Sequence, residues 1–232
     1  MNFRRFQALT FDCYGTLIDW ERGLSAAFEP WLERSGLTLS HAALLSAYGE
    51  EEGRIQNETP KALYPAILSN VLKALGRRFG APVSDSEAEA FARSIRDWPP
   101  FPDSPAALAK LKKRFKLAIV SNVDRESFRH SKVKLGVEFD LVVTAQDVGA
   151  YKPNPAHFHE ALRRLKELGI PKECVLHVAQ SLYHDHVPAK ALGLSTVWVD
   201  RRHGQGGGIA ARAPVEPDWT VLSLSELVDL IG

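Results

Sequence analysis

Four polar segments of this 232-residue chain carry side chains whose types could together perform covalent chemistry. They supply a carboxylate, a hydroxyl and amide pair, a cation and a second carboxylate, at Asp12, Ser121 with Asn122, Lys152 and Asp185. A nucleophile, hydrogen-bond donors, a fixed cation and a further carboxylate form the set that a covalent mechanism on an anionic substrate requires.

The first of these segments reads FDCYGTL and spans residues 11–17. Asp12 stands at the C-terminal end of a predicted strand, which is where open α/β sheets bind ligands. Gly15 permits a sharp turn there, and Thr16 can hydrogen-bond a bound anion or the Asp12 carboxylate. An isolated Asp after a strand more often caps a turn. The three other segments favour its interpretation as a nucleophile.

Short runs rich in β-branched and aromatic residues predict buried strands, because they are too short for helices. The predicted strands are Ala8–Phe11, Leu117–Val120, Leu141–Thr144, Val175–Val178 and Thr196–Val199. Between the later strands lie predicted helices at Arg125–Leu135, Pro155–Leu168 and His186–Leu192. Strands that alternate with helices in this way predict an α/β fold with a parallel sheet.

Residues 20–98 break this alternation, because they contain consecutive predicted helices and no predicted strand. The helices are expected at Trp20–Ser35, Ser40–Gln56, Pro60–Phe79 and Ser84–Asp97. Ser40 and Ser84 are expected to cap helix N-termini, while Gly36 and Gly80 are expected to end helices. A helical unit inserted after the first strand suggests a ligand site at its interface with the sheet.

The four polar segments, in this order and with helices between the first and the second, resemble the haloacid dehalogenase superfamily. FDCYGTLID, at residues 11–19, is the most specific motif, and the resemblance covers nearly the whole chain. It implies a doubly wound, parallel-sheet (Rossmann-like) α/β core made of residues 1–17 and 99–232. A helical cap domain is then expected at residues 18–98.

Most members of this superfamily are magnesium-dependent phosphatases, and the chain departs from them at two positions. Their second aspartate, which protonates the leaving group, is here Tyr14, and a phenol with an ordinary pKa of about 10 is a poor acid catalyst at neutral pH. An acidic residue that helps to hold magnesium is here Gln180. A phosphatase with magnesium at Asp12 and Asp185 nevertheless remains an alternative.

The Asp-x-Tyr-Gly-Thr-Leu form resembles the (S)-2-haloacid dehalogenase branch, called type II, which needs no metal cofactor. By this resemblance Asp12 displaces halide from a short 2-haloalkanoic acid and forms an ester, which water then hydrolyses. Asp185 would act as general base or place the water, and Lys152 would keep Asp12 ionised. Three further side chains would assist as donors to Asp12, to the substrate carboxylate or to the halide: Thr16, Ser121 and Asn122.

Substrate contacts are expected from five residues near the nucleophile or in the cap: Tyr14, Trp20, Arg54, Gln180 and Ser181. The dehalogenases carry a cap arginine that helps to bind halide, and Arg54 is the only arginine of the corresponding helix, later than the family places it. Of the family's Ser-Ser-Asn in the fourth motif, only Ser181 is matched. Other cap aromatics are expected in the core, and the run Glu50–Glu52 on a solvated helix face.

Composition excludes several classes of function. Twenty-nine Lys and Arg against 28 Asp and Glu give a net charge of +1, which argues against a nucleic-acid binder. No run reaches the roughly 20 apolar residues of a membrane span, and two cysteines are too few for a disulfide scaffold. A small-molecule enzyme of the cytoplasm is expected, with a glycine-rich loop at residues 204–208. The family resemblance makes a homodimer a further expectation.

A third hypothesis is a non-catalytic binding protein that keeps the scaffold. The displaced cap arginine and the altered fourth motif would suit such a protein. Retention of Asp12, Ser121, Lys152 and Asp185 together argues against it. The sequence therefore favours a dehalogenase, with a phosphatase and a binding protein as the alternatives.

Overall fold

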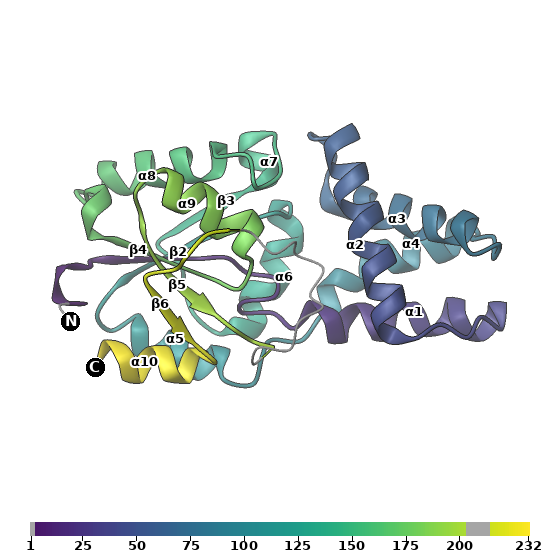
Figure 1. Ribbon diagram of the computed structural model, residues 1–232, viewed down its shortest axis with the longest axis horizontal. Coiled ribbons are helices and arrows are strands. Elements are labelled where there is room, and N and C mark those ends of the chain that lie inside the picture. The colour runs from purple at the N-terminus through teal and green to yellow at the C-terminus, as the bar shows by residue number, and fades with distance from the viewer. Residues whose placement is uncertain (1–2, 203–213) are drawn as a thin grey trace.

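The computed structural model describes residues 3–202 and 214–232. Figure 1 shows an α/β part that contains the sheet and, to one side of it, a group of helices. The predicted glycine-rich loop at residues 204–208 lies outside the described residues.

The described residues form one six-stranded sheet in the order β3-β2-β1-β4-β5-β6, with every neighbouring pair parallel. The strands are β1 (Ala8–Phe11), β2 (Lys116–Ser121), β3 (Leu141–Thr144), β4 (Val175–Ala179), β5 (Ser195–Val199) and β6 (Trp219–Val221). The five predicted strands are thus confirmed within one residue at either end. Strand order reverses beside β1, so ligands are expected at the C-terminal ends of β1 and its neighbours.

Helices cover both faces of the sheet, which confirms the doubly wound core (Figure 1). Alternate strand residues pack on one face with α5 (Ser104–Leu111), α6 (Arg125–Leu135) and α10 (Leu224–Ile231). The other face packs against α8 (Ala156–Glu167) and α9 (Val187–Ala191). Both faces are therefore apolar, as a buried parallel sheet requires. Short helices complete the core at η1 (Phe3–Arg5), α7 (Ala145–Val148), η3 (Lys172–Cys174) and η4 (Leu182–His186).

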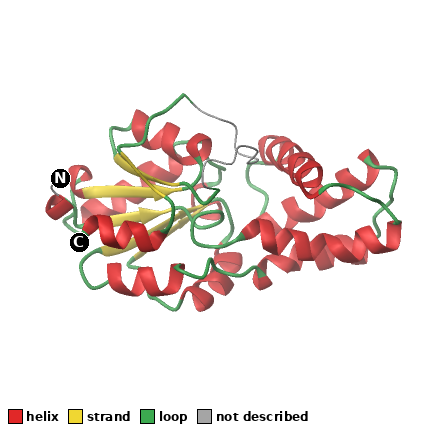
Figure 2. Cartoon of the chain, turned by 60° about the horizontal axis from the view of Figure 1, so that its bottom comes forward, coloured by secondary structure: helices red, strands yellow, loops and turns green. Residues whose placement is uncertain are grey.

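Between β1 and α5, residues 20–97 form helices without a strand, and we call this segment the helical insertion. It comprises α1 (Trp20–Ser35), α2 (His41–Glu58), α3 (Tyr64–Arg78), α4 (Asp85–Arg93) and η2 (Ser94–Asp97), which lie beside the sheet in Figure 2. Ser40 caps α2 and Ser84 caps α4, as predicted, and Ser84 also forms a capping box with Glu87. Gly36 ends α1 in the left-handed conformation.

The two segments that connect the helical insertion to the core lie side by side. Ile18 pairs with Pro100 in an isolated β-bridge. The Asp19 amide donates to the Pro99 carbonyl at 2.8 Å, and the Phe101 amide donates to the Leu17 carbonyl at 3.0 Å. The chain therefore leaves the core and returns to it at one place, immediately after the nucleophile loop.

Three regions differ from the sequence prediction. The strand β6, which is only three residues long with one exposed residue, the helix α10 and the four-residue helix α7 were not predicted. The helix predicted to begin at His186 is preceded by a π-turn, η4, so that Asp185 lies within helical chain. Turns with i→i+5 hydrogen bonds are rare overall, and those that do occur are often found at functional sites.

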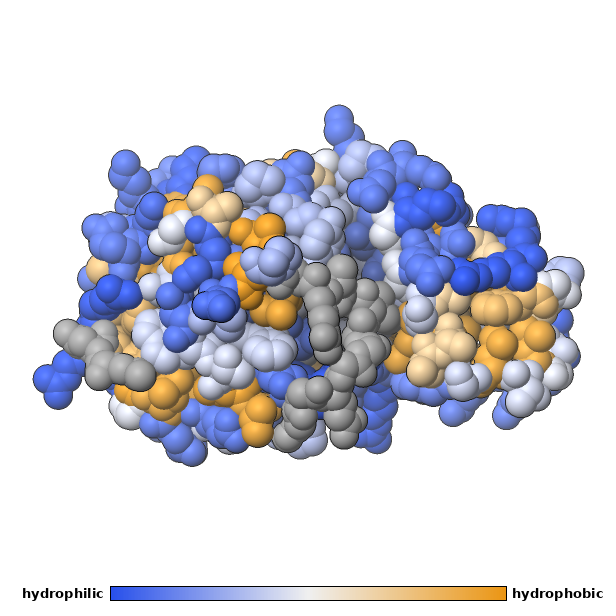
Figure 3. Space-filling model, viewed as in Figure 1, coloured by the Kyte–Doolittle hydropathy of each residue, from blue (hydrophilic) through white to orange (hydrophobic). Residues whose placement is uncertain are grey.

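The surface in the view of Figure 3 is mostly hydrophilic over the core, and apolar residues gather over the helical insertion. Among the described residues, no helix is both long enough and apolar enough to cross a membrane. Large apolar side chains that are exposed are few and scattered, and they include Val133, Leu168 and Tyr183. Scattered exposed apolar side chains are ordinary in soluble domains.

Candidate active site

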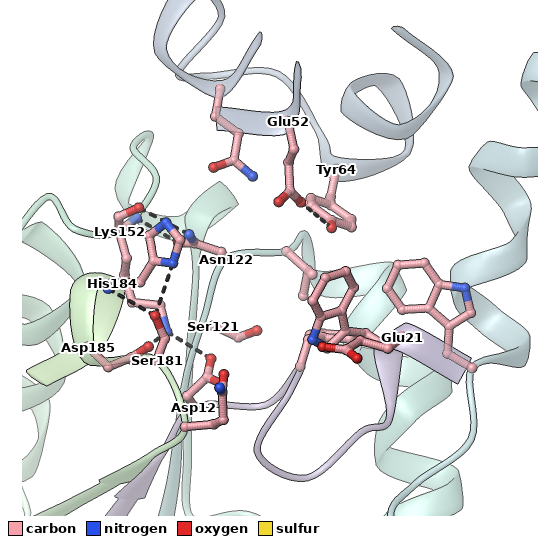
Figure 4. Close-up of a pocket in the computed structure, with 16 residues that line it drawn as sticks. Asp12, Glu21, Glu52, Tyr64, Ser121, Asn122, Lys152, Ser181, His184 and Asp185 are labelled. Carbon is pink, nitrogen blue, oxygen red and sulfur yellow. Dashed lines mark hydrogen bonds and ion pairs between the residues drawn. The ribbon is translucent and has the colours of Figure 1, made fainter. Parts of the chain in front are cut away.

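A pocket of about 770 Å³, counting its solvent-filled mouth, lies between the strand ends and the helical insertion. Its floor carries Asp12 after β1, Ser121 at the end of β2 and Asp185 in η4, and the insertion supplies Glu52 and Tyr64 (Figure 4). The sequence prediction of a ligand site at this interface agrees with the position of this pocket.

Asp12 is fixed at both carboxylate oxygens. Its Oδ2 accepts a hydrogen bond from Thr16 Oγ1 at 2.8 Å, and its Oδ1 accepts one from Lys152 Nζ at 2.9 Å. Gly15 has a φ of 97°, which turns the loop so that Thr16 comes back to the carboxylate. The Gln180 amide donates to Thr16 Oγ1 at 2.9 Å and orients that hydroxyl. The carboxylate therefore has one defined position, 6% exposed, at the pocket.

Lys152 lies at the centre of the site and is almost completely buried, with a side-chain exposure of 1%. Its ammonium donates to Asp12 Oδ1, to Asp185 Oδ1 at 2.7 Å and to the Val120 carbonyl at 2.9 Å. These three acceptors use the three protons that an ammonium has. The Asn122 side chain holds the backbone of Lys152 at both ends, with Lys152 N to Asn122 Oδ1 at 2.6 Å.

Asp185 is supported from beneath by a chain of buried side chains. Its Oδ1 contacts His177 Nε2 at 3.2 Å, and His177 Nδ1 contacts Thr10 Oγ1 at 2.9 Å. An ionised carboxylate only accepts hydrogen bonds, so His177 Nε2 donates to Asp185. The contact with Thr10 holds the other side of the ring, and the imidazole therefore fixes the orientation of Asp185.

The two carboxylates differ in their electrostatic environment. Burial raises the pKa of Asp12 above its ordinary value of 3.8; the charge of Lys152 lowers it and that of Asp185 raises it further. Burial also acts to raise the pKa of Asp185, but Lys152 and His177 outweigh it and hold this pKa well below the usual range. Burial acts to lower the pKa of Lys152, yet the two carboxylates raise it, so the residue is an ammonium.

Tyr14 lines the pocket with its ring, but its hydroxyl points elsewhere. The hydroxyl is 2.8 Å from Ser131 Oγ, and the ring packs edge-on against Trp98. Burial raises the pKa of the Tyr14 phenol well above its ordinary value. Tyr14 occupies the position of the phosphatases' acid, but its hydroxyl is turned away from the nucleophile. The phenol is also not acidic enough to protonate a leaving group.

Three other expected substrate contacts and two of the expected donors lie at the pocket: Trp20, Gln180 and Ser181, with Ser121 and Asn122. Ser121 Oγ is buried and has no hydrogen-bond partner within the described chain. A buried hydroxyl without a partner indicates a place where a ligand supplies the bond. Ser181 Oγ contacts His184 Nδ1 at 3.2 Å and caps the turn that carries Asp185.

Arg54 does not lie at the pocket, contrary to the sequence prediction. Its guanidinium pairs with Glu51 and Glu58 on the outer face of α2, and the side chain is 46% exposed. The prediction of a solvated run at Glu50–Glu52 is wrong for Glu52, which faces the pocket and bonds Tyr64 and Tyr48. Tyr64 and Trp98 are buried in the core, as expected, and they also line the pocket.

Arg201 and Trp198 are supporting residues that the sequence did not reveal. Arg201 follows β5 and donates from Nε and Nη2 to the Thr16 carbonyl, while its Nη1 pairs with both oxygens of Asp103. Trp198 Nε1 donates to the Gln180 carbonyl at 2.8 Å. Both fix the loops around the nucleophile. The position of Arg201 after a strand was the only signal available in the sequence.

Asp12 and Asp185 are the carboxylates on the pocket floor that could hold a magnesium ion, and one oxygen of each already bonds the ammonium of Lys152. Within residues 3–202 and 214–232, no three His, Cys, Asp or Glu side chains are grouped as metal ligands. Magnesium prefers several oxygen ligands, and Gln180 contributes no charge to replace a carboxylate.

Comparisons with known proteins show which family and which relatives this chain resembles. The model of the haloacid dehalogenase-like hydrolase family matches residues 6–193. Haloacetate dehalogenase H-2 of Moraxella sp. (strain B) is 26% identical over 243 aligned positions, which cover 99% of both chains. Phosphoserine phosphatase of Thermus thermophilus is 30% identical over 207 positions, covering 87% of this chain and 78% of the relative.

A solved structure shows the same architecture. The crystal structure of an L-2-haloacid dehalogenase matches with a TM-score of 0.80 and 26% identity, covering 98% of this chain and 100% of the other. Dehalogenases and phosphatases are thus both among the similar proteins, and both are hydrolases of one family. With the family model matching most of its length, the chain belongs to the haloacid dehalogenase-like hydrolases.

Proposed function

We propose that this hydrolase displaces halide from a short 2-haloalkanoic acid through a covalent ester on Asp12, without a metal. The observation that carries the proposal is the hydroxyl of Tyr14, which bonds Ser131 rather than facing Asp12. The nucleophile loop therefore supplies no acid for a leaving group. A halide leaves as a stable anion and needs none, whereas the oxygen leaving group of a phosphate ester does.

In the first step an Asp12 oxygen attacks the carbon that bears the halogen. A C–O bond forms, the C–halogen bond breaks and the halide departs with the electron pair. Lys152 and Thr16 hold the carboxylate ionised and oriented. Ser121 Oγ, buried and without a partner, is assigned to the substrate carboxylate. Asn122 Nδ2 bonds the Lys152 carbonyl with one proton and can donate its other proton to the halide.

In the second step water attacks the carbonyl carbon of the Asp12 ester. The bond between this carbon and the oxygen that carries the substrate then breaks. One proton of the water ends on the alkoxide of the 2-hydroxy acid, and the other passes to Asp185 and then to solvent. The depressed pKa of Asp185 limits its strength as a base, so its main contribution is to orient the water. Asp12 is regenerated as a carboxylate.

The test is halide release from chloroacetate and 2-chloropropionate in the presence of EDTA. We expect release with EDTA present, and mass spectrometry should find an alkyl adduct on the peptide that contains Asp12. The variant Asp12→Asn should lose turnover, because an amide is a poor nucleophile. Near-native rates in Asp12→Asn would contradict the mechanism.

The alternatives give different results in parallel assays. Magnesium-dependent cleavage of an aryl phosphate, without halide release, would identify a phosphatase and refute the proposal. Inertness in both assays would favour a binding protein. The phosphatase assay is warranted because phosphoserine phosphatase is among the relatives of this chain.

A further inference from the structure

The wall of the pocket opposite Asp12 carries an acidic residue in place of the arginine that was expected there. Glu52 comes from α2 and points into the pocket from the side of the insertion, as Figure 4 shows. Its neighbours in the sequence face outward, where Glu50 pairs with Arg78 and Glu51 pairs with Arg54. Glu52 is thus the one member of this run that is placed to meet a ligand.

Two phenols hold the Glu52 carboxyl group in place. Its Oε1 accepts from the Tyr64 hydroxyl at 2.5 Å and from the Tyr48 hydroxyl at 3.2 Å, and the two hydroxyls are 3.0 Å apart. Burial raises the pKa of Glu52, while the hydrogen bonds from Tyr64 and Tyr48 lower it. Both phenols donate to the same oxygen. The second oxygen, Oε2, therefore has its accepting capacity available.

No cation compensates Glu52 within the part of the chain that the structure describes. Lys152 is shared by Asp12 and Asp185, and the remaining acid of the pocket, Glu21, pairs with Arg202. Two carboxylates with one ammonium already leave the floor with a formal charge of −1, and an ionised Glu52 adds to it. An anionic group of a ligand is disfavoured beside Glu52, and a hydrogen-bond donor is favoured.

We propose that Glu52 is a specificity-determining residue, which accepts a hydrogen bond from a hydroxyl or ammonium group of the substrate at the end remote from Asp12. This proposal rests on the proposed function, because it takes from that function the position of the reacting carbon at Asp12. The substrate class is thereby narrowed to short 2-halo acids that carry such a donor group. A purely aliphatic haloacid would offer no hydrogen-bond donor to Oε2 of Glu52.

Binding of unreactive acids tests this without any chemical step. Propionate, 3-hydroxypropionate and β-alanine share a carboxylate and differ in the group at the other end. NMR titration of the wild-type protein should show at least about tenfold tighter binding of the last two acids than of propionate, which is the usual effect of a hydrogen bond to a charged group. Equal binding of the three acids, or no binding, would overturn the proposal.

Variants assign the preference to Glu52. Glu52→Ala should bind the three acids equally, and its retained binding of propionate would show that the pocket is folded. Glu52→Gln keeps an acceptor oxygen but loses the charge, so the preference for β-alanine should fall more than that for 3-hydroxypropionate. Glu50→Gln, on the outer face of α2, is the matched control and should behave as wild type. A preference that survives in Glu52→Ala would refute the role of Glu52.

Halide release separates this proposal from the proposed function. Wild-type protein should release chloride from 2-chloro-3-hydroxypropionate with a higher kcat/KM than from 2-chloropropionate, and Glu52→Ala should remove that difference mainly through KM. If neither compound releases chloride while the Glu52-dependent binding preference persists, the proposed function fails, and with it the restriction to 2-halo acids, while the role of Glu52 in binding a donor group stands. If both release chloride equally in wild type and in Glu52→Ala, this inference fails and the proposed function stands.

Discussion

Asp12 and Asp185 share one ammonium, yet their environments push their pKa values in opposite directions. Asp185 accepts from Lys152 and His177 and stays ionised. Asp12 is buried beside that second negative charge, and its pKa is raised. The nucleophile is therefore the carboxylate whose ionisation limits the reaction as the pH falls.

We expect this difference to appear in the pH dependence of kcat/KM. Only ionised Asp12 attacks, and its pKa lies above 3.8, so activity should be lost as the pH falls through a value higher than that of an ordinary aspartate. The measurement is the rate of chloride release from 2-chloropropionate between about pH 3 and 8. An acid limb at or below the ordinary value would contradict the assigned environment.

His177 is predicted to act on the second step through Asp185. His177→Leu removes a buried donor to a carboxylate, which is worth about 1.5–3 kcal/mol, so ester hydrolysis should slow about tenfold or more. Mass spectrometry should then find more of the Asp12 adduct at steady state. Thr10→Val removes only the hydroxyl that fixes the imidazole and should give a smaller change of the same sign. An unchanged adduct fraction in His177→Leu would exclude this role.

At the scale of elements, the helices of the insertion pack closely at one glycine and loosely at another. A Cβ added to Gly23 of α1 would lie 2.3 Å from Trp98 Cγ, whereas one added to Gly53 of α2 would meet nothing within 4 Å. Gly23→Ala should therefore destabilise the protein by about 1–3 kcal/mol. Gly53→Ala should stabilise it by about 0.5–1 kcal/mol. Urea unfolding of both variants measures the two effects, and equal shifts would contradict this packing.

Strands and helix caps could be predicted because their signals are local. The central strands are continuous apolar runs buried on both faces, and Ser84 with Glu87 is a capping box that spacing alone reveals. The strand β6 could not be predicted, because three residues with an exposed Thr220 carry no periodicity. The π-turn before α9 could not be predicted either, because i→i+5 turns are rare and have no sequence pattern of their own.

Site residues that follow the ends of strands could be predicted from the sequence. A site residue whose position depends on which face of a helix it occupies could not. Asp12, Lys152 and Asp185 were expected together and lie within hydrogen-bond distance of one another through Lys152. Glu52 was missed because it belongs to a charged run. Its spacing of four residues from Tyr48 and from Gln56 was the available signal, since residues i, i+4 and i+8 share a helix face, and both neighbours are buried.

At the scale of the whole molecule, a lysine of the core holds the end of the helical insertion. Lys134 of α6 donates to the Arg96 carbonyl and, at 2.9 Å, to the Trp98 carbonyl. Lys134→Met should cost about 1–2 kcal/mol in the free energy of unfolding. Lys132→Met on the same helix removes only a pair with the exposed Glu138 and should cost less than about 1 kcal/mol. Urea unfolding compares the two, and equal losses would argue against a special contact at Lys134.

The two connecting segments that pair at Ile18 and Pro100 divide the chain into a core, which carries the reactive residues, and the helical insertion, which carries the opposite wall of the pocket. Because the exit and the return are adjacent, the covalent chain joins the insertion to the core at one place. The wall that carries Glu52 and Tyr64 and the floor that carries Asp12 and Lys152 therefore belong to separate stretches of sequence. Substitutions in residues 20–97 can alter that wall while the contacts between Asp12 and Lys152 are kept.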